Sequence, residues 1–163
     1  MGRIPFCKCG IVALWSSDVT SNQQSQQLFD PYTFTHILHG FLIYFLVWIL
    51  ARRLPPQYRL IIAVILESAW EIFENTNFVI NRYRAQTISY DYYGDSIFNN
   101  LGDILAMASG FLLAWKFPTW FSVVFVILLD LSLMYFIRDS LIINIIMLIH
   151  PIDAIKQWQM TGS

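Results

Sequence analysis

Acidic, histidine and amide side chains recur inside segments of this chain that are otherwise apolar enough to lie in a lipid bilayer. They form four groups: His36 and His39; Glu67, Glu71, Glu74 and Asn75; Asp95, Asn99 and Asp103; and Asp130. An ionised side chain at the bilayer centre costs roughly 2.5 to 3.5 kcal/mol, so these groups cannot stay isolated there. They must meet one another, a metal ion, protons or water, and their meeting place is the candidate functional site.

The composition is typical of a small integral membrane protein. Of the 163 residues, 56% are hydrophobic and 13% are charged, whereas about 25% charged residues is usual in a soluble domain. A net charge of -1 without a large Lys/Arg cluster argues against a nucleic-acid partner. We therefore expect membrane lipids as partners of a transmembrane domain, residues 33–163, which follows a polar segment, residues 1–32, at the membrane surface.

Apolar runs and their breaks predict an all-α bundle of about four membrane helices. The expected helices cover residues 33–50, 58–80, 96–115 and 120–137, with the longest loop at residues 81–95. The nine residues from Leu141 to Ile149 are too few to span a hydrocarbon core of roughly 30 Å. We expect this last segment to be re-entrant, interfacial or packed against the bundle.

If the helices alternate in direction, the start of the first, the end of the second and the start of the third lie near one membrane face. Within each helix, polar residues three or four positions apart share a side, as His36 and His39 do. Small residues beside them allow the helices to approach closely; these are Gly40, Ala69, Gly102, Ala106 and Gly110. The sequence therefore predicts one polar pocket inside the bundle.

Three kinds of chemistry suit such a pocket. A divalent metal such as zinc would take His36, His39, Glu71 and Asp95 as ligands. Alternatively, crowded carboxylates act as general acid and base, and the candidates for catalysis are Glu71, Glu74, Asp95 and Asp103. The third alternative is a hydrogen-bonded structural network or proton path without bond-breaking chemistry.

Several residues outside these groups have alternative interpretations. Cys7 and Cys9 are too few for a disulfide framework, and a redox or metal role stands beside their interpretation as ordinary cysteines. Asp130, in the middle of the last long helix, needs a partner on another helix. Arg138 and Asp139 are interpreted as an interfacial pair.

Positive charges in the short loops indicate the orientation. The side with more of them is expected in the cytoplasm, which places the polar pocket near the outer face. The cytoplasmic side then holds Arg52, Arg53, Arg59 and Lys116, and the outer side holds Arg82, Arg84 and Arg138. Arg3 and Lys8 near the N-terminus oppose this orientation.

Ordered motifs over nearly the whole chain resemble a family of uncharacterised bacterial inner-membrane proteins. They are Met1-Gly2-Arg3, Cys7-x-Cys9-Gly10, Leu14-Trp15, Ser25-Gln26, His36-x-x-His39-Gly40, Glu67-x-x-Trp70-Glu71-x-x-Glu74-Asn75, Arg82-Tyr83-Arg84, Tyr92-Tyr93-Gly94-Asp95-Ser96, Arg138-Asp139 and Trp158-Gln159. The resemblance implies a multi-pass protein of the bacterial inner membrane, with no known activity to transfer. It also implies an additional apolar helix before the equivalent of Met1.

One departure from that family concerns a histidine. Where the family tends to have Asn-Ser-Gln-His, this chain has Gln24-Ser25-Gln26-Gln27, so an activity that needed the histidine would be lost or altered. More distantly, the stretch from Asn99 to Asp103 is similar to VanZ-like membrane proteins, which implies association with the cell envelope.

Two functional hypotheses follow. The first is a metal-dependent hydrolase or transferase acting on an envelope lipid or lipid-linked substrate, because a site at membrane depth meets lipids first. The second is a noncatalytic subunit or assembly factor, in which the polar residues fix helix pairing and other membrane protein subunits are the partners.

Overall fold

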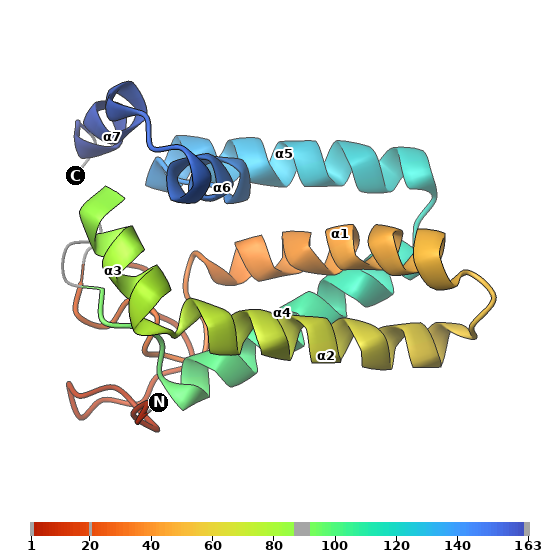
Figure 1. Ribbon diagram of the computed structural model, residues 1–163, viewed down its shortest axis with the longest axis horizontal. Helices are drawn as coiled ribbons and strands as arrows, with labels where there is room; N and C mark the ends of the chain where they lie inside the picture. The colour runs from red at the N-terminus through yellow and green to blue at the C-terminus, as the bar shows by residue number, and fades with distance from the viewer. Residues whose placement is uncertain (1, 20, 87–91, 162–163) are drawn as a thin grey trace.

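The computed structural model describes residues 2–19, 21–86 and 92–161. It is all-helical, as predicted: apart from an isolated bridge between Trp15 and Phe29, the described residues contain no β structure. The helices are α1 Thr33–Ala51, α2 Pro56–Glu74, α3 Asn77–Gln86, α4 Ile97–Lys116, α5 Thr119–Ile137, α6 Leu141–Ile149 and α7 Asp153–Met160. Figure 1 shows α1, α2, α4 and α5 along the long axis, with α3, α7 and the N-terminal segment gathered at one end.

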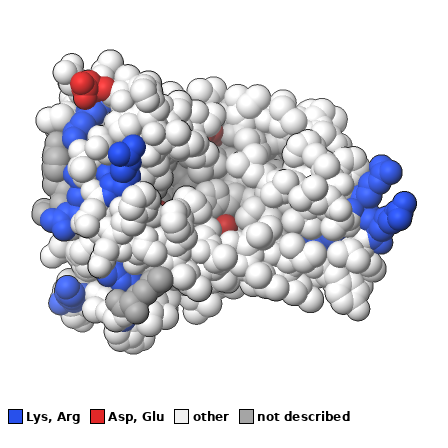
Figure 2. Space-filling model, viewed as in Figure 1, with Lys and Arg blue, Asp and Glu red and all other residues white. Residues whose placement is uncertain are grey.

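Three helices in the described part of the chain, α1, α4 and α5, are long and apolar enough to cross a membrane. The fourth predicted membrane helix, α2, is also 19 residues long, but it contains Arg59, Glu67, Glu71 and Glu74. It packs against both α1 and α4. In Figure 2 the Lys and Arg side chains gather at the two ends, and a broad band of other residues separates them.

The single helix expected over residues 58–80 is wrong, because Asn75 ends α2 and the chain turns into α3. The Asn75 Nδ2 group donates to the carbonyl of Glu71 (3.0 Å), and its Oδ1 accepts from the backbone N–H of Asp95 (2.7 Å). The side chain therefore satisfies the end of α2 and ties it to the start of the α4 region. Since α3 continues to Gln86, residues 81–86 are also not the loop that we expected, while residues 87–91 lie outside the described residues.

Glycines allow α1 and α4 to pack with their backbones in contact. A Cβ atom on Gly40 would collide with the carbonyl oxygen of Met107, and one on Gly110 would collide with the carbonyl oxygen of Ile37. The predicted role of these small residues is therefore confirmed for this pair of helices. Gly102 differs, because its contact is the backbone of Leu28 in the N-terminal segment.

The N-terminal segment folds over the start of α4. The backbone N–H of Ser96 donates to the carbonyl of Ser25, and that of Ile97 donates to the carbonyl of Ile4, both at 3.0 Å. Such bonds satisfy donors that a helix cannot satisfy internally. Within the segment, Cys7 and Cys9 form a disulfide, so their interpretation as ordinary cysteines is wrong.

Asp130 finds its partner at the start of α6. Its Oδ1 accepts from the backbone N–H of Ile142 at 3.4 Å, while Ser140, the N-cap, accepts from that of Ile143 at 3.3 Å. The buried carboxylate thus satisfies a donor at the positive end of α6. Hydrogen bonds from Arg82 to the carbonyls of Leu148 and Ile149 hold the other end of this helix beside α3, so α6 packs against the bundle.

Candidate functional site

Glu67 on α2 joins the two histidines of α1. Its Oε1 atom lies 2.7 Å from Nδ1 of His36 and 3.0 Å from Nδ1 of His39. Because an ionised carboxylate only accepts hydrogen bonds, each imidazole holds a proton on Nδ1 and donates it to Glu67. In the neutral rings the Nε2 atoms are then the ones that can bind a metal ion or accept a proton.

Two further carboxylates flank His36. Glu71 Oε1 lies 3.4 Å from its Nδ1, and Asp103 Oδ1, on α4, lies 3.8 Å from its Nε2. Among the described residues, neither oxygen of Glu71 nor Oδ1 of Asp103 has a hydrogen-bond partner, although all are buried. Buried polar atoms normally have partners, so these oxygens are suited to binding a cation. We refer to His36, His39, Glu67, Glu71 and Asp103 as the His–acid cluster.

The cluster offers two sets of three metal-ligand atoms within 4.8 Å of one another, counted over the described residues. One set is His36, His39 and Glu67, and the other is His36, Glu71 and Asp103. Since Glu67 already orients both rings, the second set fits a metal ion better. One imidazole and two carboxylates are an accepted donor set for zinc and other divalent ions, and leave a position for water.

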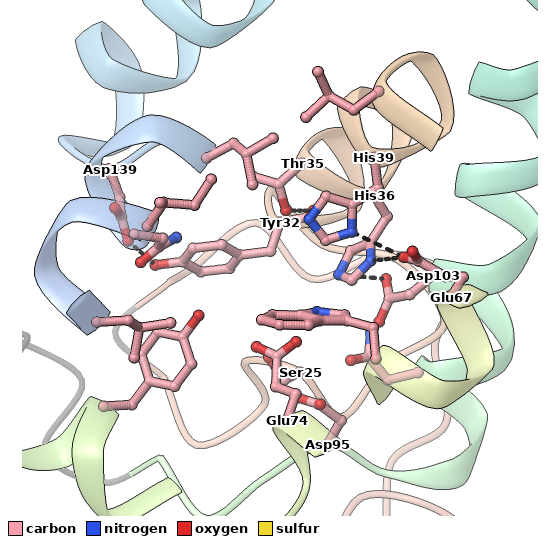
Figure 3. Close-up of a pocket in the computed structure, with 18 of the residues that line it drawn as sticks. Ser25, Tyr32, Thr35, His36, His39, Glu67, Glu74, Asp95, Asp103 and Asp139 are labelled. Carbon is pink, nitrogen blue, oxygen red and sulfur yellow. Dashed lines mark hydrogen bonds and ion pairs between the residues drawn. The ribbon is translucent and has the colours of Figure 1, made fainter. Parts of the chain in front are cut away.

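A cavity of 340 Å³ opens beside the cluster, and four cluster residues line it: His36, His39, Glu67 and Asp103. Figure 3 shows these side chains on one side, with Tyr32, Glu74 and Asp139 bordering the rest of the space. Figure 2 shows acidic atoms within a hollow in the middle of the molecule's face. We refer to this space as the polar cavity.

The other residues predicted for the site, Asp95 and Glu74, line the polar cavity but belong to neither ligand set. Asp95 accepts hydrogen bonds from Asn75 (2.8 Å) and Tyr92 (2.9 Å). Burial raises the pKa of Asp95, and these bonds oppose the increase. The neighbouring residue, Ser96, is the N-cap of α4.

Comparisons with known proteins give a family and no activity. The model of a family of proteins of unknown function, DUF2585, matches residues 1–161. This chain belongs to DUF2585. A UPF0314 protein of Sinorhizobium fredii is 52% identical over 98% of this chain and 81% of its own length. One of Paracoccus denitrificans is 48% identical over 98% and 82%, and one of Brucella anthropi is 47% identical over 97% and 80%. No solved structure matches.

Two residues of this DUF2585 chain that the sequence did not assign to the site, Tyr32 and Asp139, meet at the border of the polar cavity. The Tyr32 hydroxyl donates to Asp139 Oδ2 at 3.0 Å, and the backbone N–H of Ser140 donates to Oδ1 at 2.9 Å. Burial raises the pKa of Asp139 to about 7. The interfacial pair expected with Arg138 is wrong, because Arg138 donates instead to the carbonyl of Trp158 at 2.9 Å. The sequence feature that could have indicated Asp139 is its place as an acidic residue at the end of an apolar helix.

The position at which this DUF2585 chain lacks the expected histidine does not line the polar cavity. Gln27 is buried, accepts from the N–H of Ala13 (2.7 Å) and donates to the carbonyl of Ile11 (3.1 Å). Its neighbours Gln24 and Ser25 do line the cavity. Gln27 therefore stabilises the N-terminal segment, and its identity leaves the His–acid cluster intact.

Proposed function

We propose that this protein is a metal-dependent hydrolase or transferase of the bacterial inner membrane that acts on a lipid or lipid-linked substrate. The observation that carries the proposal is the His–acid cluster. In it, one carboxylate orients two imidazoles, and two buried carboxylates beside His36 retain oxygens without hydrogen-bond donors among the described residues. A divalent cation bound there would neutralise these acids, activate a water molecule and polarise a substrate oxygen.

The residues of the chain divide the remaining work. Glu67 holds the imidazole rings in position through their Nδ1 atoms, as carboxylates commonly do for metal-bound histidines. Glu74, which lines the polar cavity outside both ligand sets, is placed to take or return a proton. Because α1 and α4 are apolar, a substrate that resides in the bilayer can reach the site along these helices.

The first test is the metal content of protein purified in mild detergent, without chelator or metal-affinity resin. We expect about one divalent ion per chain, at least a tenfold loss in Asp103→Asn, and no loss in Asp95→Asn. Asp95 is the matched control because its carboxyl group is buried in the same cavity but belongs to neither ligand set. Wild-type protein that binds no divalent ion, even after incubation with zinc or manganese, would remove the proposal.

The alternative is a noncatalytic subunit of a larger membrane complex, and the exposure of α5 favours it. Only Asp130 and Leu133 of this helix are buried, so either lipid or another protein covers the rest. The migration of native protein in mild detergent separates the two functions. A discrete hetero-complex supports the alternative, whereas a metal-containing monomer or homodimer supports the enzyme.

A further inference from the structure

The lining of the polar cavity beyond the His–acid cluster itself combines aromatic rings with carboxyl groups. Its aromatic residues come from four separate parts of the chain and its carboxyl groups from three. The aromatic residues are Tyr32, Trp70, Tyr83 and Tyr92, and the acids are Glu74, Asp95 and Asp139. Figure 3 shows Tyr32, Glu74 and Asp139 around the same open space.

Hydrogen bonds hold this lining in place. Tyr32 is fixed by its bond to Asp139, and Tyr92 by its bond to Asp95, while Glu74 interacts with the side chain of Tyr83. Aromatic rings and carboxyl groups that line one space are the combination that recognises ammonium groups, by cation–π and charge attraction.

The charge of the lining separates two classes of polar head group. No described Lys or Arg residue lines the polar cavity, and anionic groups such as phosphate are usually held by Arg or Lys. A cationic group gains from the acids of the lining, whereas an anion placed among them is repelled. The cavity therefore favours an ammonium group over a phosphate as its innermost ligand.

The rim of the polar cavity indicates that the ligand is also apolar. Leu42 on α1, Leu66 on α2 and Ile145 on α6 line the cavity, and each is 41% to 48% exposed. Three helices thus present apolar side chains at the opening. An acyl chain lying along them would bury this surface while its head group enters the cavity.

We propose that the polar cavity receives the ammonium head group, primary or quaternary, of a membrane lipid. The inference rests on the proposed function in that it names the substrate class of the same cavity. Binding of the head group itself requires only the aromatic and acidic lining, so it can be measured without turnover.

The test compares lipids that share their phosphate and acyl chains and differ only beyond the phosphate. Protein is reconstituted in nanodiscs with equal amounts of dioleoyl phosphatidylcholine, phosphatidylethanolamine and phosphatidylglycerol, and retained lipid is identified by native mass spectrometry. We expect at least fivefold retention of one or both ammonium lipids over the glycerol lipid. Equal retention of all three, or preference for phosphatidylglycerol, would overturn the inference.

Variants locate the preference in the polar cavity. Tyr83→Leu and Asp139→Asn are each expected to reduce it at least threefold, whereas Tyr135→Leu, on the exposed face of α5, retains it. Preference that survives both cavity variants would also overturn the inference. Metal content is measured on the same samples, so a protein that selects ammonium lipids without binding metal contradicts the proposed function and leaves the inference standing.

Discussion

The carboxyl group of Asp139 has a higher pKa in the folded protein than in the unfolded chain. Burial raises its pKa to about 7 from an ordinary 3.8, and Asp130 adds to the increase, while bonds from Ser140, Tyr32 and Asn144 oppose it. The folded state therefore binds a proton more tightly than the unfolded state does. This contribution to stability is fully present below about pH 4 and is lost as the pH rises through about 7.

Asp139→Asn removes that ionisation, and we expect it to flatten the pH dependence of stability between pH 4 and 7. One such group changes the free energy of unfolding by up to about 1.4 kcal/mol per pH unit. Melting temperatures in detergent at several pH values provide the measurement. Asp153→Asn, at an exposed position of α7, serves as the control and should keep the wild-type slope. Identical slopes for all three proteins would contradict the assignment.

The sequence indicated that polar side chains of α1, α2 and α4 meet, but it did not indicate how they pair. The helical spacing of the polar residues and the free-energy cost of isolated charges in a bilayer indicated that His36, Glu71 and Asp103 must meet. The structure brings them together. The same reasoning grouped Asp95 with the histidines and left Glu67 out, whereas the structure places Glu67 beside both rings. This pairing depends on the rotation of α2 against α1, which places Glu67 Oε1 within 3.0 Å of His39 and which no local pattern encodes.

At the scale of elements, the pair α1 and α4 depends on two backbone contacts made at glycine. The hydrophobic core between the helices contains Met107 and Phe111, both buried. Since the colliding atoms for a Cβ on Gly40 or Gly110 belong to backbone, rotation of a side chain cannot relieve the overlap. The helices would have to separate, and the His–acid cluster, which spans the same interface, would separate with them.

We therefore expect Gly40→Ala and Gly110→Ala each to destabilise the protein by about 1 to 3 kcal/mol, the usual cost of overpacking. Both should also weaken metal binding, because His36 lies on α1 and Asp103 on α4. Ser109→Ala is the matched control, since Ser109 is exposed on α4 and bonds only within its own helix, to the carbonyl of Leu105. Thermal melting in detergent distinguishes the variants, and wild-type stability in both glycine variants would contradict the close packing.

The boundaries of the three most apolar helices were predicted to within one residue, because charges and prolines mark their ends. The break between α2 and α3 was missed for a physical reason. It depends on Asn75, whose amide bonds both Glu71 and the distant Asp95. A tertiary contact of this kind leaves only a polar residue in the sequence, which also fits a helix interior.

For the whole molecule, the two ends differ in ways that relate to a membrane. One end carries the loop with Arg52 and Arg53 between α1 and α2 (Figure 1), and the other carries the N-terminal segment with the disulfide of Cys7 and Cys9. Disulfides persist on the oxidising side of a bacterial inner membrane, and positively charged loops stay on the cytoplasmic side. Because Lys and Arg side chains gather at both ends (Figure 2), the disulfide carries the orientation that we propose, in which the polar cavity lies near the periplasmic face.

This orientation predicts the labelling of single cysteines by a membrane-impermeant maleimide. In a Cys7→Ser, Cys9→Ser background, Gln157→Cys on α7 is expected to react in intact spheroplasts, whereas Leu54→Cys beside the arginine loop reacts only after the membrane is opened. Both positions are exposed in the folded protein, so a difference in labelling reports sidedness. The background protein without cysteine controls for other reactions. The opposite pattern would place the cavity on the cytoplasmic side and require substrates that reach the inner leaflet.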